Sequence, residues 1–346
     1  MANAPELVFD LIFGRWRSQT LYAGAALGVF DQLSNQPRTA ASVAETISAD
    51  PAMLYRLMRA LASIGLLIEN DEKAFCLTDA GALLREDHQH SLRATALLEE
   101  GPEHYALWKH LVDMVRDGRQ NGFVREFGTM GFDYARANPS YGLIFNKAMS
   151  SMSSLTTDWT VTALAQESCA DIRDVCDIGG GHGHLGCALL KAYPQFQMTV
   201  FDLPQVVNET DHLWAPKLGL TQRCRYVGGD MFAEVPPADA YFMKSILHDW
   251  SDEECRQILT VARKALVGSG RLFVADFIVP RPDQPDFSKL FDIHMICWGT
   301  GRERTSAEYA DLMASTGWQY DATYRAQGAF LSVVAATASI DPMFAE

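Results

Sequence analysis

A run of glycines between residues 177 and 183 constrains the fold of this chain more than any other stretch. The run, Asp177-Ile178-Gly179-Gly180-Gly181-His182-Gly183, follows an apolar segment and precedes an apolar-periodic segment that begins at Leu185. That order predicts a strand, a tight turn and a helix, because glycine takes positive φ and lets a ligand touch the main chain. Asp202 follows roughly 20 positions later, at the end of a second apolar run, where an acid suits hydrogen bonds to a ribose diol. The sequence therefore predicts a site for an adenosine-bearing cofactor.

The glycine run is compatible with two kinds of cofactor. Residues 181–186 match the dinucleotide fingerprint, which favours an NAD-dependent oxidoreductase. Asp177, however, lies two residues before the first glycine, where an acid would repel a pyrophosphate. The same acid tolerates a ligand that carries an ammonium and a sulfonium, as S-adenosylmethionine (SAM) does. Later segments of the chain have to decide between the two.

The composition argues against several classes of partner. The chain has 346 residues, enough for two domains, and its formal net charge of -14 disfavours nucleic acid or an anionic membrane as the main partner. No uninterrupted apolar run approaches ~20 residues, and Met1–Asp10 lacks the pattern of a signal peptide. The seven cysteines are scattered and show no two-residue spacing. We therefore expect a cytoplasmic protein with no metal site and no disulfide framework.

The first of three predicted regions, residues 1–100, has the pattern of a winged-helix module. Apolar residues at helical spacing between Phe9 and Phe30 predict either a core helix pair or an exchanged dimer arm. A short helix, a second helix that Asp50 caps, and a hairpin follow. This order occurs in DNA-binding proteins, but the second helix offers only Arg56 and Arg59 as basic side chains. A structural or dimerisation module is therefore favoured over DNA binding.

The second and third predicted regions differ in their periodicity. Residues 101–165 are predicted to be helical, and Phe145, Met149 and Met152 recur there at helical spacing. Methionine adapts to flat ligands, so these side chains are candidates for an apolar pocket. Residues 166–346 alternate strand and helix, which is typical of a parallel α/β sheet. Two final strands, near 319–324 and 330–336, predict a closing hairpin.

Two later segments carry candidate site residues. In Gly229-Asp230-Met231-Phe232, just after a predicted strand, the acid can accept from an adenine amino group and the two apolar side chains can sandwich the ring. The segment from Lys244 to Trp250 begins as a strand and ends before a helix for which Ser251 and Glu254 form a capping box. His248 therefore lies at the carboxyl end of a strand, where α/β sheets bind ligands. An imidazole suits a general base near neutral pH.

A third segment contributes an acid. Gly301-Arg302-Glu303-Arg304-Thr305 precedes a helix that Thr305 and Glu308 cap. Glu303 is therefore predicted to face the same crevice as His248.

Taken together, these segments resemble those of the plant caffeate/flavonoid-type and bacterial antibiotic-tailoring O-methyltransferases. The glycine turn, Phe201-Asp202-Leu203-Pro204, Gly229 to Phe232, Lys244 to Trp250, and Gly301 to Thr305 occur in the order of that family, and the resemblance covers nearly the whole chain. It implies a Rossmann-like class I methyltransferase domain in residues 166–346, with a seven-stranded sheet and a C-terminal hairpin. It also implies a winged-helix dimerisation domain in residues 1–100, with the helical segment 101–165 covering the substrate.

The resemblance further implies roles for individual residues. His248 would deprotonate the hydroxyl of a small aromatic acceptor, and Glu303 would hold that histidine in position. Asp276 matches a second acidic position that is usually Glu, one methylene longer, in the plant enzymes. The residues implied to bind SAM, and its product S-adenosylhomocysteine, are Asp177, Gly179, Gly181, Asp202, Leu203, Asp230, Met231, Phe232, Lys244 and Trp250. The candidates for the acceptor pocket are Trp108, Phe145, Met149, Met152, His294, Met295 and Trp298.

Other functions remain compatible with the sequence at this stage. A related enzyme could methylate a ring nitrogen, and some relatives have drifted to hydroxylation or decarboxylation. The retained His248 and Glu303 favour a hydroxyl acceptor. An NAD-dependent oxidoreductase is supported only by the glycine run, and a winged-helix regulator with SAM as effector is disfavoured by the acidic net charge. The resemblance implies a homodimer that works without a metal.

Overall fold

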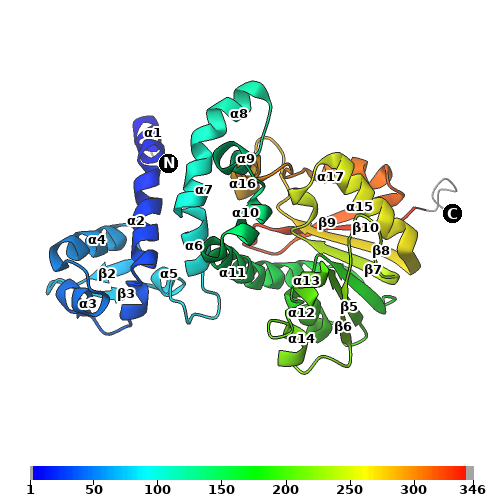
Figure 1. Cartoon of the computed structure of the whole chain (residues 1–346), viewed down its shortest axis with the longest axis horizontal. Coiled ribbons are helices and arrows are strands. Elements are labelled where there is room, and N and C mark those ends of the chain that lie inside the picture. Colours follow the sequence, from blue (N-terminus) through cyan, green and yellow to red (C-terminus); the bar gives the residue numbers. More distant parts are fainter. Residues whose placement is uncertain (1–2, 340–346) are drawn as a thin grey trace. The chain divides into compact units, whose positions relative to one another are not determined.

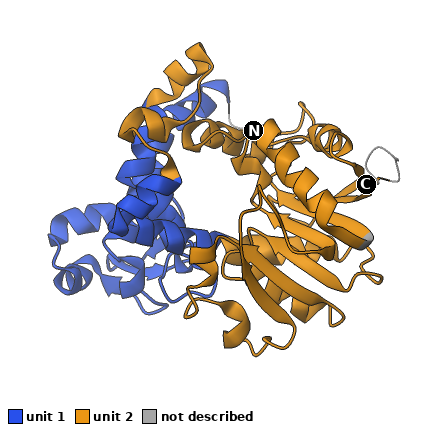
Figure 2. Cartoon of the chain, turned by 45° about the vertical axis from the view of Figure 1, so that its right-hand side comes forward, with its two compact units in different colours: residues 1–109, 132–152 blue, residues 110–131, 153–346 orange. Residues whose placement is uncertain are grey.

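The computed structural model describes residues 3–339, which form two compact units (Figure 2). The first unit comprises residues 1–109 and 132–152, shown in blue, and the second comprises residues 110–131 and 153–346, shown in orange. Each unit has its own hydrophobic core.

The first unit contains the helix, helix and hairpin that the sequence predicts. Asp50 caps α4 by accepting a hydrogen bond from the Met53 amide at 2.8 Å. The hairpin of β2 and β3 follows α4, and β1, which precedes α3, completes a three-stranded sheet in the order β1-β3-β2. Val29, Phe30 and Met58 are fully buried in the core beneath these elements. The elements are α1 (Ala4–Ile12), α2 (Gly14–Ala26), η1 (Phe30–Gln32), β1 (Arg38–Thr39), α3 (Ala40–Ile47), α4 (Pro51–Ser63), β2 (Leu67–Glu69), β3 (Ala74–Leu77), α5 (Asp79–Ala82), α6 (Arg93–Glu99), α7 (Pro102–Leu107), the start of η2 (Trp108–His110), most of α10 (Gly131–Ala137) and the first half of α11 (Pro139–Leu164).

The N-terminal helix leaves its apolar side chains uncovered within the described chain. No residue of α1 is buried, although the helix is rich in large apolar groups. The exposed ones, with Trp16 at the start of α2, are Leu7, Val8, Phe9, Leu11, Ile12 and Trp16. An apolar surface of this kind is typical of an interface rather than of a free surface.

The second unit is built on a seven-stranded sheet in the order β6-β5-β4-β7-β8-β10-β9. The five strands from β6 to β8 run parallel, and β10 pairs antiparallel with both β8 and β9, so the predicted closing hairpin is confirmed (Figure 1). The strands are β4 (Asp174–Ile178), β5 (Gln197–Asp202), β6 (Cys224–Gly228), β7 (Ala238–Lys244), β8 (Leu266–Asp276), β9 (Trp318–Arg325) and β10 (Ser332–Ala338).

Helices cover both faces of this sheet. One core joins α11 and α12 to side chains such as Phe242 and Phe273, and the other joins α15 and α17 to the opposite face, through Tyr241 and Leu272. Both capping boxes that the sequence predicts are present, at Ser251 before α15 and at Thr305 before α17. The helices of this unit, besides the second half of α11, are α8 (Leu111–Asp117), α9 (Gly122–Phe127), α12 (His184–Ala192), α13 (Pro204–Val207), α14 (Trp214–Lys217), η3 (Leu247–Asp249), α15 (Asp252–Ala265), α16 (Phe287–Trp298) and α17 (Ser306–Ala314).

This topology places the segments predicted to bind the cofactor and to carry His248 along one edge of the sheet. Because β6, β5, β4, β7 and β8 are parallel neighbours, the segments that follow them meet at their common carboxyl edge. Among the described residues, no helix combines the length and apolarity that crossing a membrane requires.

Candidate active site

The turn after β4 has a backbone that requires glycine. Gly179, Gly181 and Gly183 have φ of +68°, +56° and +86°, in the left-handed region that other residues rarely adopt. A Cβ on Gly179 would lie 2.2 Å from Ile246 Cδ1, and one on Gly183 would lie 2.6 Å from Tyr226 Oη. A Cβ on Gly181 would meet no atom within 4 Å. The main chain at Gly181 is therefore open to a ligand.

Asp202 and Leu203 lie beside this turn. The carboxylate of Asp202, at the end of β5, accepts from the Gly181 amide at 2.8 Å and from the Leu203 amide at 2.7 Å. Burial raises the pKa of Asp202, while these two amide donors oppose the rise. Two backbone amides thus hold the Asp202 carboxylate against the glycine turn, at the end of the strand where the sequence predicts this acid.

Asp177 lies beneath the turn rather than at its surface. Its side chain is 1% exposed, and a Cβ on Gly180 would lie 2.7 Å from its Oδ2, which has no hydrogen-bond partner among the described residues. Burial raises the pKa of Asp177 to about 7, and the ammonium of Lys244 opposes this shift. Lys244 ends β7 and donates to Thr156 Oγ1 at 3.3 Å. Asp177 is therefore too deeply buried to touch a ligand at the surface of the turn, and its predicted influence on a ligand would be electrostatic.

The segment after β6 lies at the same carboxyl edge of the sheet. Asp230 is exposed, and its Oδ1 accepts from the Phe232 amide at 2.9 Å. Met231 and Phe232 are partly buried, and the ring of Phe232 meets that of Trp250 edge-on at a centroid distance of 4.9 Å. Trp250 thereby joins this segment to the loop that carries His248.

His248 and Glu303 form a buried pair. His248 lies on η3 and is 6% exposed, and its Nδ1 lies 2.7 Å from Glu303 Oε1. If Nδ1 carries the proton that Glu303 accepts, the neutral ring keeps the lone pair of Nε2 for another proton. Burial raises the pKa of the Glu303 carboxyl, and the imidazolium of His248 opposes that rise.

Several carboxylates determine the charge of this imidazole. Burial disfavours the imidazolium, but the surrounding carboxylates outweigh burial and raise the pKa of His248 to about 10. Those carboxylates belong to Glu303, Asp249 and Asp276. Asp249 lies 3.8 Å from Nε2, which is an ion-pair distance and too long for a hydrogen bond.

Asp276 makes a different contact from the one its family position implies. Its Oδ2 accepts from Tyr309 Oη at 2.6 Å, whereas its Oδ1 has no hydrogen-bond partner in the described part of the chain. No hydrogen bond joins Asp276 to His248 within residues 3–339. The shorter side chain is therefore paired with α17, and Asp276 acts on His248 through its charge.

Aromatic rings cover the imidazole on one side. Phe291 stacks on His248 at a centroid distance of 6.0 Å, and His294 stacks on Phe291 at 5.2 Å. Phe277 lies 6.4 Å from the His248 ring and 4.5 Å from that of Phe291. Phe291 and His294 are one turn apart on α16, so this helix forms an aromatic wall stacked against the face of the His248 ring.

The predicted acceptor residues are divided between the two units. In the second unit, His294 joins the aromatic wall, Met295 is 2% exposed, and Trp298 meets Phe123 edge-on at 5.1 Å. The remaining four belong to the first unit, and they are Trp108, Phe145, Met149 and Met152. This pocket stays a prediction.

Sequence analysis missed Phe291 and Asp249. Asp249 is adjacent to His248 in the chain, but adjacency alone does not indicate that its carboxylate faces the imidazole. Phe291 could have been found from its spacing, because it lies one helical turn before His294.

The fold and the site together define a class I methyltransferase. This class is indicated by the strand order with an antiparallel closing hairpin, the glycine turn after β4 and the acid at the end of β5. The profile of the O-methyltransferase domain matches residues 108–319, and that of the O-methyltransferase dimerisation domain matches residues 9–87. The chain therefore belongs to the SAM-dependent O-methyltransferase family. The resemblance is confirmed, and the NAD-dependent alternative is wrong.

Individual relatives support this assignment over nearly the whole chain. The chain is 32% identical over 314 residues to the phenazine O-methyltransferase PhzM of Lysobacter antibioticus, with 90% of each chain covered. It is 33% identical over 319 residues to the mitomycin biosynthesis 6-O-methyltransferase of Streptomyces lavendulae, covering 91% of this chain and 89% of that one. The structure of CalO1, a methyltransferase in calicheamicin biosynthesis, in its S-adenosylhomocysteine-bound form is similar with a TM-score of 0.85 at 28% identity, covering 98% of this chain and 100% of that chain.

One glycine next to the pair offers a direct test of its geometry. A Cβ on Gly301 would lie 1.8 Å from the backbone oxygen of His248, so Gly301→Ala is expected to push the loop away from Glu303. We expect a loss of about 1–3 kcal/mol in the free energy of unfolding, together with a fall in turnover. Gly299→Ala is the matched control, because a Cβ there meets no atom within 4 Å. Equal thermal unfolding midpoints and turnover for the two variants would contradict this expectation.

Proposed function

We propose that the chain transfers the methyl group of SAM to a hydroxyl group, of phenolic type, on a small aromatic molecule, with His248 as the general base. The observation that carries the proposal is the pair of His248 and Glu303 at 2.7 Å, at the carboxyl edge of the sheet and beside the Phe291 wall. A phenol has an unperturbed pKa of about 10 and is a poor nucleophile at neutral pH. A base that removes its proton as the oxygen attacks would therefore accelerate the transfer.

The cofactor crevice has the chemistry that SAM requires. Gly181 offers open main chain, Asp202 offers a carboxylate beside the turn as an acceptor for ribose hydroxyls, and Met231 offers an apolar surface for an adenine ring. Asp177 and Lys244 set the charge beneath the turn. When bound, SAM supplies an electrophilic methyl group on a sulfonium.

Each protein group then has a separate task. Glu303 accepts the Nδ1 proton and so keeps Nε2 of His248 available as the base. Once Nε2 has taken the hydroxyl proton, the carboxylates of Glu303, Asp249 and Asp276 stabilise the imidazolium. Phe291 and His294 provide a flat surface on which an aromatic acceptor can lie, and alignment of the acceptor oxygen supplies much of the rate enhancement.

The exposed apolar face of α1 supports a homodimer. The face comprises the side chains named above on α1 and Trp16, and it falls largely within residues 9–87, the part that matches a dimerisation domain. We propose that a second copy of the chain covers it.

A methyl-transfer screen tests the proposed reaction. The purified protein is incubated with methyl-labelled SAM and polyphenols, aromatic polyketides or heteroaromatic acids, and each hydroxylated compound is paired with its deoxy analogue. We expect label on the hydroxyl oxygen of at least one compound and none on its deoxy partner. Label on the ring nitrogen of compounds that lack a hydroxyl, with none on any hydroxyl, would favour the N-methyltransferase alternative instead.

A further inference from the structure

We propose that Arg304 is a positioning residue whose guanidinium fixes the backbone of the loop that carries His248. The inference rests on the proposed function, because it concerns how the base of that reaction is held. Arg304 follows Glu303 directly in the chain, and it is fully buried at 0% exposure. Arginine is almost never fully buried unless its charge and its donors are paired.

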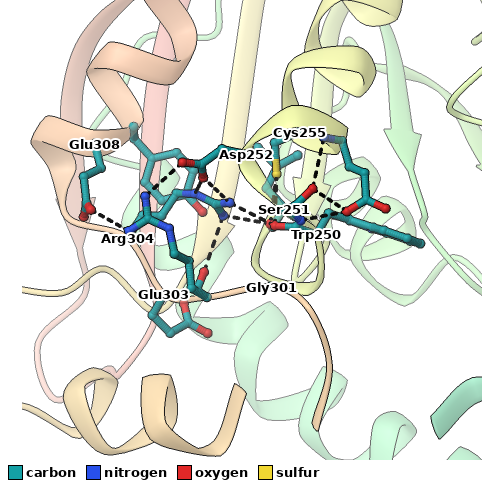
Figure 3. Close-up of polar contacts among 12 residues, drawn as sticks. Trp250, Ser251, Asp252, Cys255, Gly301, Glu303, Arg304 and Glu308 are labelled. Carbon is teal, nitrogen blue, oxygen red and sulfur yellow. Dashed lines mark hydrogen bonds and ion pairs between the residues drawn. The ribbon is translucent and has the colours of Figure 1, made fainter. Parts of the chain in front are cut away.

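The guanidinium contacts both ends of the turn around His248. Figure 3 shows Arg304 with Trp250 and Asp252, and dashed lines mark their polar contacts. One terminal nitrogen donates to the backbone oxygen of Leu247 at 2.8 Å, and the other donates to that of Trp250 at 2.9 Å. Leu247 and Trp250 flank His248 and Asp249, so the two bonds bracket the residue that is proposed as base. Nε and one terminal nitrogen also donate to Asp252 Oδ1, at 3.0 and 2.7 Å, which neutralises the buried cation.

The loop needs such a support because its own backbone is poorly stabilised. Ser245, just after β7, has φ of +55°, a left-handed conformation that is costly for a non-glycine residue. The turn that follows, η3, has only three residues, and a single 3₁₀ turn has weak hydrogen-bond geometry. The direction of the imidazole therefore depends on contacts from outside the loop.

Cys255 on α15 supplies one set of these contacts, because its Sγ donates to the Leu247 and Trp250 oxygens at 3.1 and 3.5 Å, and the segment Gly301 to Arg304 supplies another. Gly301 lies against the backbone oxygen of His248, Glu303 holds the imidazole nitrogen, and Arg304 holds the flanking carbonyls. This segment is also hydrogen-bonded to the stretch of chain that follows β8, because the Val279 amide donates to the backbone oxygen of Arg304 at 2.9 Å. Glu303 thus positions the imidazole ring, and Arg304, the next residue in the chain, positions the loop backbone. A shift of this segment would therefore move the ring and the loop together.

The geometry requires arginine rather than any cation. The guanidinium is planar and has five N–H donors, so it can donate to two carbonyls and one carboxylate at once. A lysine ammonium is a point charge and cannot span these three acceptors. Arg302 offers a matched control within the same segment. It pairs with Asp252 and Glu308, as Arg304 pairs with Asp252, but its side chain is 42% exposed, and within residues 3–339 it makes no hydrogen bond to the His248 loop.

The experiment is chemical rescue of Arg304→Ala. We expect kcat for methyl transfer to fall by about ten-fold to 100-fold, because a small misplacement of a catalytic group has effects of that size. The dissociation constant of SAM, measured by calorimetry, is expected to stay within a few-fold of wild type. Guanidinium ion at concentrations well below those that unfold the protein should fill the vacated space and restore part of kcat, while equal sodium chloride should not. Arg302→Ala should retain kcat and show no rescue.

Other outcomes would overturn the inference. It fails if SAM affinity and kcat fall together in proportion to the folded fraction, if guanidinium gives no rescue, or if Arg302→Ala behaves like Arg304→Ala. Should Arg304→Ala not fold, Arg304→Lys is measured in the same way, and a kcat equal to wild type refutes the role. Methyl transfer by the wild type and by Arg302→Ala reports on the proposed function separately, so that the two failures are distinguishable.

Discussion

Replacing His248 by alanine is expected to lower kcat for methyl transfer by roughly 10²- to 10⁴-fold, the usual contribution of a general base. The imidazole is 6% exposed and makes its 2.7 Å contact with Glu303 rather than with the cofactor turn. The affinity for SAM should therefore stay within a few-fold of wild type. His248→Gln keeps a polar side chain of similar size without a basic nitrogen, and it should lose turnover to a similar extent.

The acidity of the acceptor sharpens this test. An acceptor whose phenol pKa lies near 7 is already largely ionised at pH 8, so it needs the base less than one whose pKa is about 10. The loss caused by His248→Ala should accordingly shrink as acceptor acidity rises. His88→Ala, in the first unit, controls for the removal of a histidine elsewhere. Turnover within a few-fold of wild type for weakly acidic acceptors would exclude His248 as the base.

The sheet, and the edge of it at which the candidate site residues lie, could be predicted from the sequence because both follow from the order of strands and helices. Alternating strands and helices imply parallel neighbours, and parallel neighbours bring the ends of β4, β5, β6 and β7 to one edge. The capping boxes at Ser251 and Thr305 were also readable, since each is a local pattern of four residues. The placement of Lys244 and Asp202 at that edge needed no tertiary information.

Contacts between distant segments could not be predicted in the same way. Tyr309 donates a hydrogen bond to Asp276, and this pairing depends on how α17 packs against the sheet. The burial of Arg304 is similarly invisible in the sequence, where it stands among other charged residues and is typical of a solvated cluster. Asp177 lies beneath the glycine turn only because the turn folds over it. Side-chain packing across segments, and not local pattern, decides each of these.

The Glu303→Gln variant is expected to change both the rate and its pH dependence. The carboxylates around His248 raise its pKa to about 10, so in the wild type kcat/KM should increase with pH through the neutral range, about ten-fold per unit. Removing the charge of Glu303 destabilises the imidazolium and lowers the pKa of His248. The rising limb of the pH profile should therefore move to lower pH in the variant.

The plateau of that profile should also fall, because glutamine changes the tautomer of the ring. A carboxylate can only accept at Nδ1, whereas a glutamine amide can donate its N–H there and leave the proton on Nε2. Nε2 then has no lone pair for the acceptor's proton, and the comparable change in a Ser-His-Asp triad costs about 10⁴ in kcat. Glu308→Gln is the control, because Glu308 lies in the same segment but pairs with Arg302 and caps α17. A Glu303→Gln profile with the wild-type limb and plateau would mean that Glu303 sets neither the charge nor the tautomer of His248.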